Sequence, residues 1–316
     1  MPMKDQPMRP EISPADLLQR FFGYDRFRGS QEKIIRHVMS GRHAMVVMPT
    51  GMGKSLCYQI PALANEPGDG RLVLVLSPLI ALMQDQVESL TRRGIEAALI
   101  NSSLDRETRS KRYAELASGH FRLVYVTPER FRKTEFREAL QNRSVSLLAV
   151  DEAHCVSQWG HDFRPDYSRL GEIRRWLGDP TTMALTATAT AECRRDIYRQ
   201  LEIQPDEIEL FHEGIDRPNL SIDVTPVWGD EDKLEAIETS LRHPRYQGGS
   251  VIVYFSLIKT LERFSDALLR RGVDHVCYHG DLPRDRRRKI QDQFMSSEVD
   301  VVLATNAFGM GVDKED

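Results

Sequence analysis

The sequence predicts an α/β fold built from two parallel-sheet domains. Short apolar runs alternate with amphipathic segments along the 316 residues, which is the rhythm of right-handed β-α-β units. The rhythm breaks at Asp216–Asn219 and then starts again. A chain of this length exceeds the usual size of a single core, so two domains are the default. We place the first domain at residues 1–213 and the second at residues 214–316.

The first domain is expected to begin with a helix, because Ser13 suits an N-cap, Pro14 the first helical position and Asp16 the first turn. Apolar runs predict strands at Ala44–Met48, Leu72–Leu76, Ala97–Ile100, Phe121–Val126, Val145–Val150, Thr182–Leu185 and Glu207–Phe211. Amphipathic segments predict helices at Lys54–Leu63, Leu79–Leu90, Arg106–Ala117, Asp166–Trp176 and Ala191–Leu201.

The second domain repeats the same rhythm without a phosphate loop of its own. Strands are expected at Leu220–Val224, Ser250–Phe255, His275–Tyr278 and Val299–Leu303. Helices are expected at Asp230–Leu241, Ile258–Arg270 and Arg284–Met295. Strands of this kind form a parallel sheet that helices cover on both faces.

Bulk composition narrows the class of protein. The net charge of −4 excludes a generic polycation, so any nucleic-acid binding has to rest on local patches. No stretch approaches the apolar length of a membrane helix, and the polar, Pro-rich Met1–Pro10 segment is not a signal peptide. Four scattered cysteines, without metal-like spacing, indicate reduced thiols in a cytoplasmic protein: Cys57, Cys155, Cys193 and Cys277.

A glycine-containing loop, Met48–Ser55, joins a predicted buried strand to a predicted helix. Backbone N–H groups and the helix dipole favour a phosphate there, the Lys54 ammonium can reach its terminal group, and the Ser55 hydroxyl can ligate Mg²⁺. We expect nucleotide contacts from Thr50, Gly51, Met52, Gly53, Lys54 and Ser55. The general pattern begins with Gly where this chain has Met48, and an ordinary glycine turn is the alternative.

An acidic pair argues against that alternative. Asp151 and Glu152 follow the strand Val145–Val150, at the carboxyl edge where α/β proteins bind ligands. Asp151 suits a Mg²⁺ ligand, and Glu152 suits a base that orients the attacking water. With the loop, this pair predicts a nucleoside-triphosphate hydrolase.

At this point the motifs resemble the RecQ family of superfamily-2 DNA helicases, from about Leu17 to Asp316. The resemblance implies two RecA-like domains, the second incomplete. It also implies that Tyr24 stacks on adenine while Arg28 and Gln31 bond its edge, roles that an aromatic ring, a guanidinium and an amide suit. Without the family, Tyr24 is equally a core aromatic.

Three further segments resemble strand-binding motifs of the first domain: Ser77–Gln86, Thr127–Arg130 and Ser157–Tyr167. They imply DNA contacts from Ser77, Thr127, Arg130, Trp159, His161, Phe163 and Arg164. Aromatic rings can stack on unpaired bases, and hydroxyls and Arg can hold phosphates. The alternatives are helix caps for the first two segments and core packing for the third.

Other motifs concern coupling and the second domain. Thr186–Thr190 looks like the motif that links hydrolysis to domain movement, and His154 would relay nucleotide state towards the aromatic segment. By resemblance, Thr305 contacts a strand phosphate and Asp313, in the turn Gly309–Asp313, contributes to the nucleotide site. The basic run Arg284–Lys289 has the composition of a DNA-binding patch, but such a run is more typical of a solvated helix face.

The resemblance therefore implies an ATP-dependent DNA helicase with 3′-to-5′ polarity, ATP and Mg²⁺ as cofactors, and single-stranded or tailed duplex DNA as its partner. Repair and recombination are the implied processes, and no protein partner is indicated. RecQ relatives continue beyond this chain's last motif with an arginine-finger motif and a zinc module. We therefore expect no zinc in this chain and impaired unwinding. A weak nucleotide- and strand-binding fragment and an RNA helicase are the alternatives.

Overall fold

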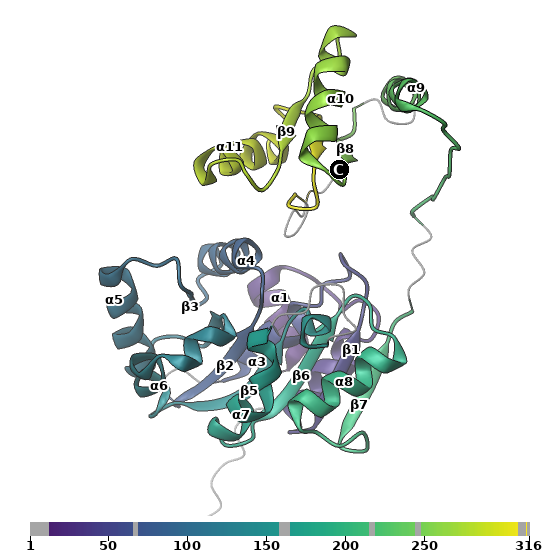
Figure 1. The fold of residues 1–316 in the computed structure, drawn as a ribbon. Helices are drawn as coiled ribbons and strands as arrows, with labels where there is room; N and C mark the ends of the chain where they lie inside the picture. The colour runs from purple at the N-terminus through teal and green to yellow at the C-terminus, as the bar shows by residue number, and fades with distance from the viewer. Residues whose placement is uncertain are drawn as a thin grey trace, which may run out of the picture. The chain divides into compact units, whose positions relative to one another are not determined.

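The computed structural model describes residues 13–65, 69–157, 165–214, 219–243, 248–308 and 314. The chain divides into two compact units, Met1–Asp216 and Arg217–Asp316, and each is described by itself (Figure 1). Trp159, His161, Phe163, Arg164 and Asp313, which the sequence singled out, lie outside the described residues.

The first unit is built on a seven-stranded sheet with the order β3-β4-β2-β5-β6-β1-β7. All of its neighbouring strands are parallel. The strands are β1 (His43–Val47), β2 (Arg71–Leu76), β3 (Ala97–Ile100), β4 (Leu123–Val126), β5 (Ser144–Val150), β6 (Thr181–Thr186) and β7 (Ile208–His212). The helices that follow the adjacent strands β1 and β6 pack against opposite faces of the sheet, and doubly wound sheets bind ligands at such a point.

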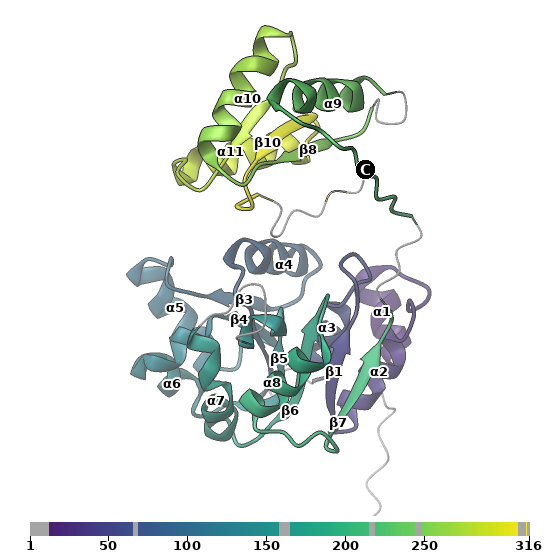
Figure 2. The same cartoon turned by 45° about the vertical axis from the view of Figure 1, so that its right-hand side comes forward.

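Helices cover both faces of this sheet (Figure 2). One layer holds α1 (Pro14–Phe22), α2 (Gln31–Met39), α3 (Leu56–Ala64) and α4 (Ile80–Arg92). The other holds α5 (Arg106–Ala117), α6 (Thr134–Leu140), α7 (Leu170–Trp176) and α8 (Ala191–Leu201). Short 3₁₀ turns, η1 (Pro128–Arg132), η2 (Ala153–Val156) and η3 (Pro165–Arg169), complete the unit.

Strand β1 shows why its sequence is apolar throughout. Met45 and Val47 pack into the α5–α8 layer, whereas Ala44 and Val46 pack into the α1–α4 layer. None of the four exposes any surface. Because alternate residues of a strand point to opposite faces, a strand covered on both faces needs a continuous apolar run.

The second unit has a parallel sheet of order β8-β10-β9, with β8 (Val251–Tyr254), β9 (Val276–Tyr278) and β10 (Val301–Ala304). Helices α9 (Asp230–Arg242) and α10 (Ile258–Arg270) share one core cluster with Leu303, and α11 (Arg284–Met295) packs in a second with Val302. The expected strand Leu220–Val224 is wrong. Its apolar alternation is present, but no described strand pairs with it, and Ile222 is 92% exposed.

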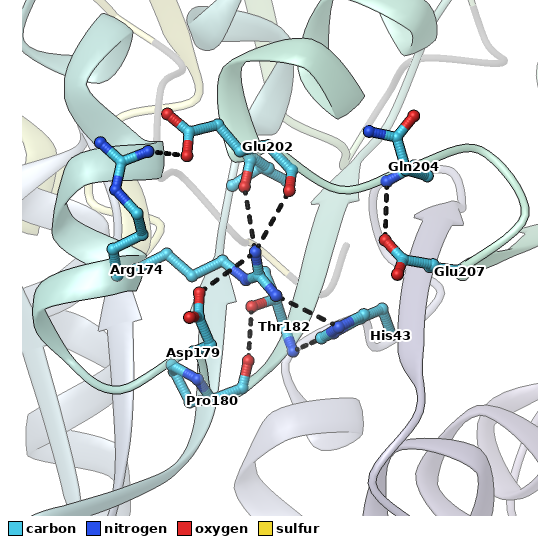
Figure 3. A network of polar contacts seen from close by, with 10 residues as sticks. His43, Arg174, Asp179, Pro180, Thr182, Glu202, Gln204 and Glu207 are labelled. Atoms are coloured by element: carbon cyan, nitrogen blue, oxygen red, sulfur yellow. Dashed lines mark hydrogen bonds and ion pairs between the residues drawn. The ribbon is translucent and has the colours of Figure 1, made fainter.

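A polar network ties elements together at the amino end of the first sheet, with Arg174 in its middle (Figure 3). The guanidinium donates to the carbonyl oxygens of Leu201 and Glu202, where α8 ends, at 3.5 and 3.3 Å. It also lies 3.4 Å from Asp179 and 3.4 Å from the His43 ring. One mostly buried side chain thus holds α7, α8 and the start of β1.

His43 is part of the same network. Its Nδ1 accepts the backbone N–H of Thr182 at 3.0 Å, which joins the starts of β1 and β6. Burial first, and then the charge of Arg174, hold the pKa of His43 below its usual value of 6.5. The neutral ring is therefore the form that the fold uses.

We expect Arg174→Ala to destabilise the first unit by about 1–3 kcal/mol, because a mostly buried charged donor to the carbonyl groups of Leu201 and Glu202 is lost. Its neighbour gives a matched control, since Arg175 pairs with Glu202 but is 55% exposed. Arg175→Ala should cost under about 0.5 kcal/mol, as exposed pairs usually do. Urea unfolding midpoints of both variants test this, and equal losses would contradict it.

We also expect this unit to lose stability in acid through His43. Because the pKa of His43 is lower in the folded state than the unfolded value of 6.5, the unfolded chain binds more protons than the folded chain when the pH falls below about 6.5. The stability that neutral His43 contributes is complete above the unfolded pKa and is lost as the pH falls below it. His43→Asn keeps an acceptor for Thr182 but cannot titrate, so it should show a shallower fall between about pH 7.5 and about pH 5.5 in urea unfolding. Parallel pH profiles would rule this role out.

Candidate functional site

The loop between β1 and α3 has the backbone that its glycines predict. Gly51 and Gly53 have φ of 82° and 77°, a left-handed conformation that other residues adopt at a cost. The Lys54 ammonium donates to the Met48 carbonyl oxygen at 3.0 Å, so it lies over its own loop. Helix α3 begins at Leu56, slightly later than expected, with Ser55 as its N-cap.

Gln31 joins this loop to the segment before α2. Its Nε2 donates to the carbonyl oxygens of Met52 and Gly53, both at 3.0 Å, and its Oε1 accepts the backbone N–H of Arg28 at 2.8 Å. The side chain is 1% exposed, whereas Arg28 and Tyr24 are exposed. The structure thus brings Gln31 to the phosphate loop, a contact that the sequence did not predict.

Asp151 follows β5 and is 7% exposed. Its Oδ1 accepts the backbone N–H of Glu152 at 3.0 Å. Burial first, and then the charge of Glu152, raise the pKa of Asp151 to about 7, while the charge of Lys54 opposes the shift. A buried carboxylate so close to a phosphate loop is suited to a divalent cation, whose charge would offset the cost of burial.

Glu152 has φ of 49°, which puts its side chain beside His154. Nδ1 of His154 lies 3.3 Å from Glu152 Oε2 and 3.0 Å from Thr186 Oγ1. The Thr186 hydroxyl donates to the Thr188 carbonyl, so it must accept from the ring, and Nδ1 therefore carries the proton. The acidic motif and the Thr186–Thr190 segment are thus in direct contact.

Register places the remaining polar residues in one row. Leu76 pairs with Val150 on one side and with Val126 on the other, so the next residues, Ser77, Asp151 and Thr127, leave the sheet side by side. All three are at most 7% exposed. The carboxyl edge of β4-β2-β5 is therefore a continuous polar line that leads away from the phosphate loop.

Asn101 extends this row, and the sequence reasoning missed it. Ile100 pairs with Val126, so Asn101 leaves β3 next to Thr127. Its Oδ1 accepts the N–H and the hydroxyl of Ser103, at 3.0 and 2.8 Å, which fixes the amide orientation. Its buried Nδ2 has no hydrogen-bond partner in the described part of the chain. The signal was the one used for Ser77: a polar residue directly after an apolar run.

Arg130, in η1, is 7% exposed, and its Nε has no hydrogen-bond partner among the residues that the structure describes. No ion pair to it occurs within the described ranges, so its charge is available to an anion. Thr305 follows β10 in the second unit and is also 7% exposed. In the run Arg284–Lys289, the side chains that the structure describes are exposed except for Arg287, as in a solvated helix face.

Two family models match the chain. A DEAD/DEAH box helicase model matches residues 28–196, and a helicase conserved C-terminal domain model matches residues 232–316. The search for membrane spans finds none among the helices of the described residues.

Two solved structures have the same fold at low sequence identity. S. cerevisiae Dbp5 L327V bound to RNA and ADP BeF3 has a TM-score of 0.72 at 18% identity, over 92% of this chain and 74% of that one. The DUF1998 helicase MrfA bound to DNA also has a TM-score of 0.72, at 20% identity, over 98% of this chain and 44% of that one.

Curated relatives are much closer in sequence. ATP-dependent DNA helicase RecQ of Bacillus subtilis is 44% identical over 300 residues, 94% of this chain and 49% of that protein. The RecQ of Haemophilus influenzae is 40% identical over 99% of this chain and 49% of that protein. The chain spans about half the length of these relatives. With both helicase models matched and this identity along nearly its whole length, the chain belongs to the RecQ family of DEAD/DEAH box helicases.

Proposed function

We propose that this chain is the motor region of an ATP-dependent DNA helicase, which couples ATP hydrolysis to 3′-to-5′ movement on a single strand. The observation that carries the proposal is the shared carboxyl edge of the first sheet. The phosphate loop and Asp151 lie at one part of that edge, and the polar row of Asn101, Thr127 and Ser77 continues from it. A strand held in that row would lie beside the site of hydrolysis.

In this proposal Tyr24, Arg28 and Gln31 recognise adenine, and the loop N–H groups and Lys54 hold the phosphates. Ser55 and Asp151 would hold Mg²⁺, which supplies charge neutralisation on the phosphate oxygens. Lys54 and Gln31 first have to leave the loop carbonyl oxygens that they contact here. Binding therefore includes a local rearrangement of the loop.

Glu152 is the proposed base that orients water and accepts its proton. Its contact with His154 lets a change in the charge of Glu152 reach Thr186, because the ring bridges the two side chains. His154 is thus proposed to relay the state of the nucleotide to the Thr186–Thr190 segment. In this proposal the relay runs from His154 to the Thr186 hydroxyl and from there to the Thr188 carbonyl oxygen.

The DNA strand is proposed to contact Ser77, Thr127, Arg130 and, in the second unit, Thr305 through its phosphates, which carry no sequence information. Trp159, Phe163, His161 and Arg164 are proposed to stack on its bases or hold its backbone. Support for the strand site is the buried, unpartnered Nε of Arg130 and Nδ2 of Asn101, both of which need an acceptor.

The function is tested by measuring ATP hydrolysis without nucleic acid, with single-stranded DNA and with RNA. Strong stimulation by DNA alone supports the proposal, whereas stimulation by RNA alone would favour an RNA helicase. Strand displacement on 3′-tailed and 5′-tailed duplexes then tests polarity. Preference for the 5′ tail would contradict the direction that we propose.

We expect Glu152→Gln to cut ATP turnover by roughly 10²–10⁴-fold, the range for a positioned base, while ATP binding stays nearly unchanged. Lys54→Ala should instead weaken ATP binding, because the ammonium contacts the phosphates in both the ground state and the transition state. Nucleotide titrations and single-turnover hydrolysis separate these effects. Equal loss of binding in the two variants would show that the roles are not distinct.

We expect Arg130→Gln to weaken single-strand binding roughly tenfold and to reduce the slope of log affinity against log salt by about 0.7, one phosphate contact. Arg137, an exposed residue of α6, provides a control with the same charge change. Fluorescence anisotropy of a labelled oligonucleotide at several salt concentrations measures both. A slope that is unchanged in Arg130→Gln, or reduced equally in Arg137→Gln, would remove Arg130 from the strand site.

A further inference from the structure

A carboxylate from the end of the first unit holds the start of α2. Glu213 Oε1 accepts the backbone N–H of Ser30 at 2.8 Å, across 183 positions of sequence. Ser30 is the N-cap of α2, but its side chain makes no capping hydrogen bond. Glu213 therefore supplies the acceptor that the helix start lacks, where the helix dipole also favours a negative charge.

The second oxygen of the Glu213 carboxylate lies close to Gly29. A Cβ at Gly29 would lie 2.8 Å from Glu213 Oε2, and Gly29 has φ of 48°. Only glycine allows the chain to turn there with the carboxylate in place. The segment Arg28–Gln31 is thus shaped around Glu213.

From this segment the contacts continue into the phosphate loop. Gln31 follows Ser30 directly, and its amide is bonded to the carbonyl oxygens of Met52 and Gly53. A Cβ at Gly53 would lie 2.6 Å from Gln31 Nε2, so the two segments fit closely. Glu213 is at one end of this line of contacts, and the phosphate loop is at the other.

The backbone of Glu213 is itself fixed beside that loop. Its N–H donates to the Val47 carbonyl oxygen at 3.1 Å, one residue before Met48, and β7 pairs with β1 along its length. The carboxylate therefore starts from a well-held position. It links the strand that enters the phosphate loop to the segment that is proposed to recognise the base.

We propose that Glu213 is a positioning residue for base recognition: it sets the conformation of Arg28–Gln31 and so the preference for adenine. This inference rests on the proposed ATP site. Removal of the carboxylate frees the Ser30 N–H and loosens the turn at Gly29, while the phosphate contacts of Lys54 are unaffected. Loss of the carboxylate should therefore reduce the preference for ATP over triphosphates of other bases more than it reduces the affinity for the triphosphate group.

Glu209 provides the matched control. It lies on β7, the strand that Glu213 directly follows, and also contacts α2, with Oε1 3.5 Å from Lys33 Nζ and Oε2 3.3 Å from His37 Nδ1. Lys33 and His37 are the third and seventh residues of α2, so both contacts lie beyond the segment Arg28–Gln31. A variant at Glu209 therefore loses a strand-to-helix tether without touching the base-recognition segment.

The experiment compares affinities for ATP and inosine triphosphate, which differ at the base, in the full chain by displacement of a fluorescent nucleotide. Glu213→Ala should lower the ATP preference about fivefold, which corresponds to about 1 kcal/mol, the typical net contribution of one hydrogen bond. Glu213→Gln, whose amide oxygen can still accept the Ser30 N–H, should recover most of it. Glu209→Gln should keep the wild-type ratio.

Thermal unfolding of each variant verifies that the fold is intact. If Glu213→Ala unfolds, Glu213→Asp replaces it, because the shorter side chain withdraws the carboxylate from the Ser30 N–H and should also lower the ATP preference. An unchanged ATP preference in folded Glu213→Ala overturns the inference, as does an equal loss in Glu209→Gln. A wild-type chain without any ATP preference would instead overturn adenine recognition in the proposed function. The two failures are therefore distinguishable.

Discussion

The common register of parallel strands is the constraint on which the candidate site depends. The last four residues of each of strands β2, β4 and β5 are buried on both faces, so a row of polar side chains is best accommodated where these strands end. Because the strands are in register, those ends form one line. A slip by one residue would move Asp151 or Ser77 out of the line and would also exchange the two faces of the strand.

The two edges of the first sheet gather different polar groups. At the amino edge, Arg174 and His43 meet donors and acceptors from several elements, which suits a structural role, although Nε of Arg174 has no hydrogen-bond partner among the described residues. At the carboxyl edge, Asp151 has a raised pKa beside the charge of Lys54, and Asn101 and Arg130 each keep a buried nitrogen without a hydrogen-bond partner among the described residues. The perturbed carboxyl group beside the phosphate loop supports assigning function to this edge.

Much of the fold could be predicted because local patterns and tertiary packing agree. Helices α5, α8, α10 and α11 have the bounds that periodicity gave, and the strand bounds differ by one or two residues. Helices α2 and α6 were missed, since α2 lay within a motif considered only for its chemistry and α6 is a short helix beside η1.

The prediction of a strand at Leu220–Val224 was wrong because here the local pattern and the tertiary packing disagree. Its alternation is a local signal, but a strand requires a hydrogen-bonded neighbour, and no described strand pairs with it. In the site, motif spacing led to the phosphate loop and to Asp151. It could not reveal Gln31 against Met52 or Glu213 against Ser30, because those contacts depend on how distant segments pack.

The phosphate loop has one more consequence, for the departure of product. Lys54 and Gln31 have carbonyl partners within the loop, so emptying the site does not leave an ammonium or an amide without hydrogen bonds. A nucleotide must exchange these contacts for its own, and its net affinity is the difference between the two sets. An affinity lowered in this way favours fast release, which the proposed motor would need, since each spent nucleotide has to leave before the next can bind.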